Sequence, residues 1–167
     1  TEGAVPAVGT KGEIYVAWSY DSKLYFDKSL DGGKTWLDTD LIVAEQKGGW
    51  QINVEGVNRS NGMPVTLCDL SNSEFRGTVY VNWADQRNGE KDTDIWLAKS
   101  TDGGKTWSES KRINDDETKT QQYLTWTTID QTTGYLYTIF YDRRNYEDWQ
   151  TDVYLAYSTD GGKTFKN

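Results

Sequence analysis

The feature that most constrains this chain is an eight-residue motif that occurs three times. The copies are SLDGGKTW at 29–36, STDGGKTW at 100–107 and STDGGKTF at 158–165. Copies this similar within 167 residues indicate a repeat architecture, in which each repeat is one supersecondary unit that stacks on the next.

Each motif is typical of a tight turn between two β-strands. Its Gly-Gly pair supplies the positive φ angles that other residues avoid, so the chain reverses after the aspartate. The aspartate accepts hydrogen bonds from amides of its own turn, and the closing aromatic starts the return strand with a large apolar face. We therefore expect the following residues to be structural and not catalytic: Asp31, Gly33, Trp36, Asp102, Gly104, Trp107, Asp160, Gly162 and Phe165.

Strand-like segments surround each motif. A turn glycine followed by aromatic and β-branched residues recurs at 12–18, 77–83 and 134–140, with another short strand ahead of each glycine. A third strand leads into the motif, and the segment after it, as at 41–44, supplies the fourth. The composition agrees, because 8 Trp, 11 Tyr, 4 Phe and 16 Gly suit an all-β protein with many turns.

Four short strands in a meander are the content of one β-propeller blade. The predicted fold is therefore all-β, a propeller segment of about three four-stranded antiparallel blades. The blade units are about 1–46, 47–112 and 113–167 within a single segment, the second enlarged at 48–50 and 71–76. Because closed propellers have about four to eight blades, we expect a fragment of a larger propeller, with open edges that invite pairing with other protein chains.

Charge and composition exclude several classes of function. With 18 basic and 26 acidic side chains the net charge is −8, which argues against nucleic acid as a partner. No apolar run is long enough to span a bilayer. The chain has no histidine, which removes His-based catalysis and His-ligated zinc, and its single cysteine, Cys68, has no internal disulfide partner.

The motifs resemble the Asp-box, or BNR, repeats of sialidases and sialidase-like β-propellers, which have the pattern Ser-x-Asp-x-Gly-x-Thr-Trp. All three copies fit this pattern, and only Phe165 departs from the usual Trp. In that family the Asp-box hairpin joins the third and fourth strands of a blade and lies away from the active centre. The resemblance thus implies the fold more than any reaction.

A second likeness is to exported bacterial propellers described as exo-sialidase-like. Their blades carry Asp-x-Arg-Asn before the Asp-box hairpin, as do Asp85–Asn88 and Asp142–Asn145 here, the second with an extra arginine. Many such proteins resemble cargo of the type IX secretion route. The resemblance therefore implies a secreted or cell-surface location in a bacterium.

These loops supply the candidate binding residues Arg87, Arg143, Arg144, Asp85 and Asp142. A ring of arginine and aspartate at one mouth of a propeller suits a carboxylated sugar, because guanidinium groups pair with carboxylates through two hydrogen bonds. The structural alternative is an ion pair across each hairpin, from the arginine at 87 to Asp94 and from the arginine at 144 to Asp152. Arg143 replaces Gln86 at the equivalent place and is the less repetitive arginine.

No catalytic residue can be assigned from the sequence. Sialidases, as the resemblance implies, use three arginines, a Tyr nucleophile backed by a Glu, and an acid/base Asp, a variant of the retaining glycosidase mechanism. The chain has no Arg-Ile-Pro motif, and the adjacent Tyr146 and Glu147 are expected in a loop. A hydrolytic site would therefore need blades beyond these three.

We expect no cofactor, with calcium as the alternative. The acidic segments 92–94 and 114–117 offer oxygen ligands of the kind calcium prefers, but neither has EF-hand spacing. Trp50, Phe75 and Trp149 in the long loops suit stacking on sugar rings, whereas aromatic residues of such proteins also fill the space between blades.

The sequence thus favours an exported, non-catalytic module that binds a glycan or a protein. One alternative is an exo-α-sialidase or related glycoside hydrolase with part of its site in further blades. Another is a secreted component of a larger surface assembly, held through open blade edges.

Overall fold

A computed structural model describes residues 2–167, which form strands, turns and loops. In chain order the strands are β1 (Glu2–Val8), β2 (Ile14–Tyr20), β3 (Lys23–Ser29), β4 (Leu41–Glu45), β5 (Gln51–Ile52), β6 (Ser60–Asn61), β7 (Val65–Cys68), β8 (Val79–Asp85), β9 (Asp94–Ser100), β10 (Lys111–Arg112), β11 (Gln122–Ile129), β12 (Leu136–Asp142) and β13 (Asp152–Ser158). Within this range no helix has the length and apolar character needed to cross a bilayer.

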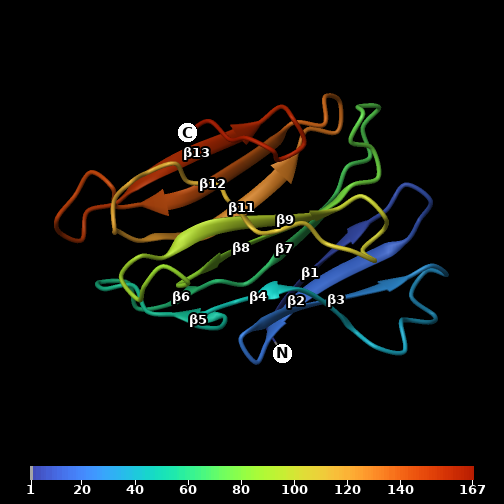
Figure 1. Ribbon diagram of the computed structural model, residues 1–167, viewed down its shortest axis with the longest axis horizontal. Helices are drawn as coiled ribbons and strands as arrows, with labels where there is room; N and C mark the ends of the chain where they lie inside the picture. The colour runs from blue at the N-terminus through green and yellow to red at the C-terminus, as the bar shows by residue number, and fades with distance from the viewer. Residues whose placement is uncertain (1) are drawn as a thin grey trace.

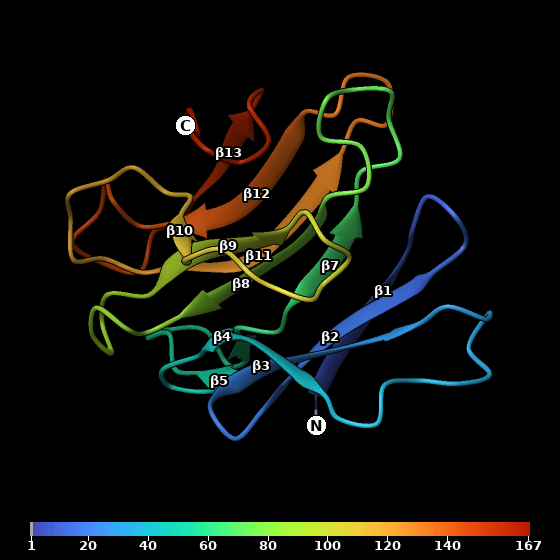
Figure 2. The same cartoon turned by 45° about the vertical axis from the view of Figure 1, so that its right-hand side comes forward.

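The strands form three antiparallel blades, as the sequence predicts. The first blade has the order β1-β2-β3-β4, the second β7-β8-β9-β10 and the third β11-β12-β13, where a single bridge between Tyr157 and Lys166 takes the place of a fourth strand. A small hairpin, β5-β6, lies between the first and second blades in the chain. Figures 1 and 2 show the three blades side by side like the leaves of a fan.

The blades pack face to face through two apolar clusters. Between the first and second blades, Phe26 and Tyr15 pack against Trp83 and its neighbours on β8. Between the second and third blades, Leu97 packs with Phe140 and other buried residues. The alternation of side chains along each strand puts one set on each face, and burying a large side chain such as Phe26 contributes roughly 1.5–3 kcal/mol.

The Asp-box turns have the geometry that their sequence predicts. Both glycines of every motif have positive φ, for example 72° at Gly103 and 83° at Gly104. In the first motif Asp31 accepts hydrogen bonds from the amides of Lys34 (3.0 Å) and Thr35 (2.9 Å) and from the Thr35 hydroxyl (2.7 Å). The amide and hydroxyl of Thr35 hold the pKa of Asp31 at about 2.

One prediction about the motif is wrong. The closing tryptophans do not start the return strand, because β4 begins at Leu41 and β10 at Lys111, several residues later. Trp107 instead packs its ring edge-on against Phe26 of the preceding blade, with ring centroids 5.0 Å apart. Trp36 turns back on its own loop and donates to the carbonyl of Gly33 at 3.2 Å.

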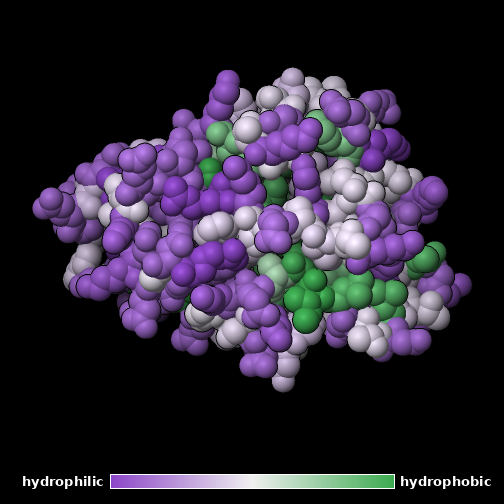
Figure 3. Space-filling view, viewed as in Figure 1, coloured by the Kyte–Doolittle hydropathy of each residue, from purple (hydrophilic) through white to green (hydrophobic). Residues whose placement is uncertain are grey.

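The two ends of the blades carry different loops. Each Asp-box turn joins the third strand of its blade to the segment that follows, whereas the loops β2–β3, β8–β9 and β12–β13 lie at the opposite end. In Figure 1 the long β12–β13 loop lies at the left and the turns lie toward the right. Figure 3 shows mostly hydrophilic side chains over the left end and a hydrophobic area over the first blade.

Candidate functional site

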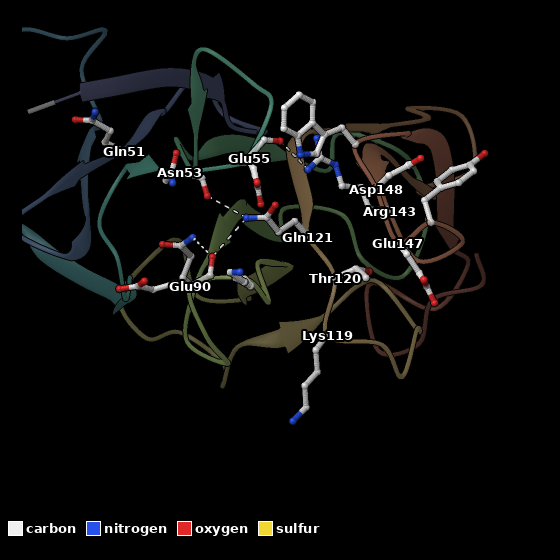
Figure 4. A pocket seen from close by; sticks show the side chains of 14 residues that line it. Gln51, Asn53, Glu55, Glu90, Lys119, Thr120, Gln121, Arg143, Glu147 and Asp148 are labelled. Atoms are coloured by element: carbon white, nitrogen blue, oxygen red, sulfur yellow. Dashed lines mark hydrogen bonds between the residues drawn. The ribbon is translucent and has the colours of Figure 1, made fainter.

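A pocket of about 730 Å³ lies at the end of the blades opposite the Asp-box turns. Its walls come from the β5–β6 insertion, the β8–β9 loop, the approach to β11 and the β12–β13 loop (Figure 4). The residues that line it are Gln51, Asn53, Glu55, Gln86, Glu90, Lys91, Lys119, Thr120, Gln121, Arg143, Tyr146, Glu147, Asp148 and Trp149. The second and third blades therefore share one polar hollow.

The pocket forms where the repeat is broken. In the first blade β2 passes to β3 through the two-residue turn Asp21-Ser22, whereas the equivalent loops of the second and third blades span residues 86–93 and 143–151. The chain between β4 and β7 is also long and contains the hairpin β5-β6. These extra residues supply most of the pocket lining.

Arg143 fixes two of these segments to each other. Its Nη1 donates to the backbone carbonyl of Glu55 (2.8 Å) and its Nε to Thr151 Oγ1 (3.1 Å), and its guanidinium carbon lies 5.4 Å from the centre of the Tyr123 ring. Arg143 is only 6% exposed. Among the ion pairs of the described residues none involves Arg143, so this buried cation faces the pocket without a carboxylate partner.

Amide side chains connect the other walls. Gln121 Nε2 donates to the carbonyl oxygens of Asn53 (3.0 Å) and Glu90 (3.4 Å), and Gln86 Nε2 donates to the same Glu90 carbonyl (2.8 Å). Figure 4 shows these bonds crossing the space between the insertion and the β8–β9 loop. They hold the floor of the pocket in place and leave the carboxylate of Glu90 free of them.

Trp149 presents an indole at the rim of the pocket. Its ring packs on Gly56, where a Cβ would lie 2.8 Å from ring carbon Cδ2, and Gly56 has a φ of 76°. A glycine is therefore needed beneath the ring both for space and for backbone conformation. The side chain of Trp149 is nonetheless 64% exposed, so it offers solvent the surface that Gly56 does not cover.

Two titratable groups of the pocket have shifted pKa values. The hydroxyl of Tyr146 donates to Asp152 Oδ1 at 2.9 Å, and this bond raises the pKa of the tyrosine. Hydrogen bonds from the side chain and the amide of Gln150 lower the pKa of Asp148. Tyr146 is thus held as a neutral phenol and Asp148 as a carboxylate.

The arginine of the first Asp-x-Arg-Asn loop lies elsewhere. Arg87 folds back on Asp85, with Nε 2.9 Å from Oδ1 and Nη2 2.6 Å from Oδ2, and its guanidinium lies 3.9 Å from the centre of the Trp96 ring. The expected ion pair with Asp94 is wrong, because Asp94 pairs with Arg112 (3.3 Å) and accepts a hydrogen bond from Asn88 (2.6 Å). Asp85 is buried two residues before Arg87 and pairs with it at 2.6 Å, so Arg87 does not pair with Asp94.

The second loop repeats this arrangement. Arg144 pairs with Asp142 (2.7 Å), Asp115 (2.6 Å) and Asp116 (3.8 Å). Burial opposes its charge, but the hydrogen bonds that Arg144 donates to Asp142 and Asp115 raise its pKa. The expected pair with Asp152 is therefore also wrong.

The five candidate residues thus do not form one ring. Arg143 lines the pocket, whereas Arg87 lines a separate hollow of about 520 Å³ beside β4 and residues 107–110. Asp85, Asp142 and Arg144 line neither hollow and are held in internal ion pairs.

A buried polar network lies between β9, β11 and β12. Asn114 Nδ2 donates to Asp94 (2.7 Å), Asp116 (2.7 Å) and Gln122 (3.1 Å), and Gln122 donates to Asp142 (3.2 Å). Amides and the arginines already described thus pair with Asp94, Asp115 and Asp116 of the acidic segments that the sequence offers for calcium. Within residues 2–167 no group of three or more Cys, Asp or Glu side chains is placed to hold a metal ion.

Most pocket residues were missed by reasoning from the sequence, which singled out only Arg143, Tyr146, Glu147 and Trp149. The missing members include Glu55, Glu90 and Gln121. The signal that could have found them is the position of the insertions, because segments that interrupt a repeat gather at one end of the blades.

Comparison with known proteins agrees with this architecture. The BNR/Asp-box repeat family matches residues 98–109 and 156–167, which contain the second and third motifs. The chain therefore carries Asp-box repeats. No curated protein matches the chain.

Several solved structures share the fold. The GH93 α-L-arabinofuranosidase of Fusarium graminearum in complex with arabinobiose has a TM-score of 0.63 at 18% identity, over 98% of this chain and 46% of that one. The Hadza microbial sialidase Hz136 has a TM-score of 0.59 at 19% identity, over 97% of this chain and 36% of that one. The Penicillium chrysogenum α-L-arabinanase with arabinobiose has a TM-score of 0.60 at 16% identity, over 98% of this chain and 48% of that one. The chain has the β-propeller fold and spans about half or less of the length of these structures.

Proposed function

We propose that this segment of an Asp-box β-propeller is a glycan-binding module whose ligand lies in the polar pocket, against the exposed ring of Trp149. The observation that carries the proposal is the combination of the solvent-exposed indole of Trp149 with a lining of planar polar side chains. A sugar has apolar C–H faces and hydroxyl edges, and this pocket offers a partner to each.

The indole supplies the apolar contact. Trp149 is supported on Gly56, so its ring does not have to be ordered when a ligand arrives. Rigid aromatic groups give a large contact area at little cost in conformational entropy. We therefore assign Trp149 the role of a platform for one sugar ring.

The polar lining suits hydroxyl groups more than a single strong charge. It includes four carboxylates (Glu55, Glu90, Glu147 and Asp148) and three cations (Lys91, Lys119 and Arg143), together with amides. Carboxylate, amide and guanidinium groups each make two hydrogen bonds in one plane. Two neighbouring hydroxyls of a sugar can bind such a planar group through both of its hydrogen bonds. Because the lining contains both acidic and basic side chains, we infer that the ligand is a neutral or weakly charged glycan.

Two groups favour binding over hydrolysis. A nucleophilic phenol needs a lowered pKa, whereas that of Tyr146 is raised by Asp152. A general acid needs a raised pKa, whereas that of Asp148 is lowered. We therefore assign neither residue a catalytic role. We further propose that the module acts outside the cell, in line with the resemblance to exported propellers.

The alternative from the same fold is an exo-α-sialidase or related glycoside hydrolase that completes its site with further blades. It is favoured by Arg143, which is buried and has no carboxylate partner among the described residues. The relatives in complex with arabinobiose support a sugar ligand in general, although the chain covers only 46% and 48% of those enzymes.

Calorimetric titration with arabinobiose and with sialyllactose tests the proposal. We expect one of the two to bind, and Trp149→Ala to weaken binding at least tenfold because the stacking platform is lost. Trp36→Phe is the matched control, because it removes another exposed indole at the opposite end of the blades. The third motif has a phenylalanine, Phe165, at the equivalent position, so the motif accepts this residue. Equal binding by the Trp149 variant would refute the site.

Assays with fluorogenic sialoside and arabinofuranoside substrates separate the two alternatives. A binding module hydrolyses neither. Turnover that disappears in Arg143→Gln would establish the hydrolase instead.

A further inference from the structure

Thr151 connects Arg143 to the backbone of Trp149. Its hydroxyl donates to the carbonyl oxygen of Trp149 (3.2 Å) and accepts a hydrogen bond from Arg143 Nε (3.1 Å). The hydroxyl of Tyr123 lies 3.1 Å from the same oxygen of Thr151. Because a threonine hydroxyl has one proton and two lone pairs, Tyr123 is the donor in this contact. The backbone of Trp149 is therefore linked, through a fully bonded threonine, to the guanidinium group of Arg143.

The other end of the guanidinium group reaches the segment beneath the indole. Arg143 Nη1 donates to the backbone carbonyl of Glu55 at 2.8 Å (Figure 4). The next residue is Gly56, on which the ring of Trp149 packs. The amide of residue 57 donates to the carbonyl of residue 54 at 3.0 Å, so Glu55 and Gly56 form the centre of a turn. One side chain thus holds both the backbone of the tryptophan and the turn on which its ring lies.

The equivalent position of the second blade shows what the arginine adds. Gln86 Nε2 donates to Thr93 Oγ1 at 3.3 Å and to the carbonyl of Glu90 in its own loop at 2.8 Å. The first of these bonds repeats the one from Arg143 to Thr151, since both threonines directly precede the third strand of their blade. The longer arginine keeps this bond and reaches beyond its own loop to the β5–β6 loop.

The bonds of Arg143 also account for a buried cation that has no carboxylate partner among the described residues. The side chain is 6% exposed, and its guanidinium carbon lies 5.4 Å from the centre of the Tyr123 ring. A carbonyl oxygen, a hydroxyl oxygen and an aromatic face each stabilise a cation. Arg143 has one of each, and they come from the β5–β6 loop, the β12–β13 loop and β11. It therefore joins three parts of the chain, whereas a single carboxylate would tie it to one.

We propose that Arg143 is a positioning residue, which holds the indole of Trp149 over Gly56 and does not itself contact the ligand. The inference rests on the proposed role of Trp149 as the platform for a sugar ring. Without the hydrogen bond to the carbonyl of Glu55, the β5–β6 and β12–β13 loops are joined less firmly. The indole then has to be ordered when the ligand binds, and the conformational entropy lost in this step lowers the affinity.

Fluorine NMR of the protein labelled with 5-fluorotryptophan tests the placement of the indole without any ligand. The signal of Trp149 is identified by its loss in Trp149→Phe. We expect this signal to shift toward that of free 5-fluorotryptophan in Arg143→Gln. The variant keeps the fold, because glutamine occupies the equivalent position 86 of the second blade. A Trp149 signal that stays in place would overturn the proposal.

Arg144→Gln is the matched control for this measurement. It makes the same chemical change at the next residue, where the arginine donates to Asp142 and Asp115. We expect the control to lower the stability more than Arg143→Gln does and to leave the Trp149 signal in place. Equal shifts in the two variants would show that the signal follows general destabilisation, and would contradict a positioning role of Arg143.

A double-mutant cycle on affinity tests whether Arg143 acts through the indole. Calorimetric titration uses the one of arabinobiose and sialyllactose that binds the wild type. Arg143→Gln should weaken binding several-fold in the wild type and cause no further loss in a Trp149→Ala background, because residues that act as one unit are not additive. Losses that multiply would show that the guanidinium group contacts the ligand itself, which would overturn the proposal. If neither sugar binds the wild type, the proposed function fails, and the fluorine signal still decides the role of Arg143.

Discussion

The two ends of the blades differ in how much they repeat. At one end the three Asp-box turns have the same hydrogen bonds, from Asp31 and Thr35 in the first to Asp160 and Thr164 in the third. At the other end a two-residue turn in the first blade becomes long, dissimilar loops in the second and third. At the repeated end Lys28 and Lys99 also donate to the carbonyls of Gly103 and Gly161 in the next blade. This end therefore joins blades to each other, whereas the divergent end forms the pocket.

Two adjacent arginines show the same contrast within one loop. Arg144, which is equivalent to Arg87 in the repeat, forms ion pairs with Asp142, Asp115 and Asp116. Arg143, which has no counterpart in the second blade, has no ion pair among the described residues and lines the pocket. The arginine that recurs in both blades thus forms ion pairs within the protein. The arginine that occurs in one blade only has no such ion pair and faces the pocket.

The largest effect is expected from Gly104→Ala. The added methyl group overlaps Phe26 and demands a positive φ of an alanine, so the free energy of unfolding should fall by about 3–4 kcal/mol. Gly103→Ala is the control: its φ is also positive, but its Cβ would have only ordinary contacts at 3.7 Å, so about 1 kcal/mol is expected. Urea unfolding measures both, and equal losses would refute the close packing of Gly104 on Phe26.

A smaller effect is expected from the paired variants Arg144→Gln and Arg143→Gln. The first leaves the buried Asp142 without its cation and should cost about 2–3 kcal/mol of stability. The second reproduces Gln86 of the middle blade, and should cost about 1 kcal/mol while weakening ligand binding. Thermal unfolding and calorimetric titration of both variants would contradict the contrast if the order of the stability losses were reversed.

The smallest effect is a pH dependence of the motif end. The pKa of Asp31 is held at about 2 by Thr35; for Asp160, burial opposes the shift, but the hydroxyl and amide of Thr164 hold its pKa at about 2 as well. Because these values lie below the 3.8 of an ordinary aspartate, the stabilisation is complete above about pH 4 and is lost as the pH falls toward 2.

Asp102→Asn isolates this contribution, since hydrogen bonds from Thr106 lower the pKa of Asp102 in the same way. The variant should unfold at a lower temperature than the wild type at pH 5, and the gap should shrink between pH 4 and pH 2. A gap that is independent of pH would show that the Asp102 charge does not stabilise the turn.

The sequence was a good guide to the fold because the fold is written in local, repeated signals. The Gly-Gly pair requires positive φ, and the alternation along segments such as 134–140 specifies a strand with two faces. Each of the three motifs could therefore be recognised within eight residues.

The pocket could not be predicted in the same way, because its residues come from four separate segments. That Gln121 would reach Asn53, or that Trp149 would lie on Gly56, depends on how loops of two blades meet. The ion pairs of Arg87 and Arg144 were mispredicted for a related reason: the aspartate two residues earlier is buried beside each guanidinium and competes better than the one across the hairpin.

The most direct test of the binding site is an NMR titration of the ¹⁵N-labelled chain with the sugar that binds. The account predicts that the indole signal of Trp149 and the amide of Gly56 shift, while the glycine amides of the Asp-box turns stay in place. Shifts confined to the Asp-box turns, with Trp149 unmoved, would contradict it.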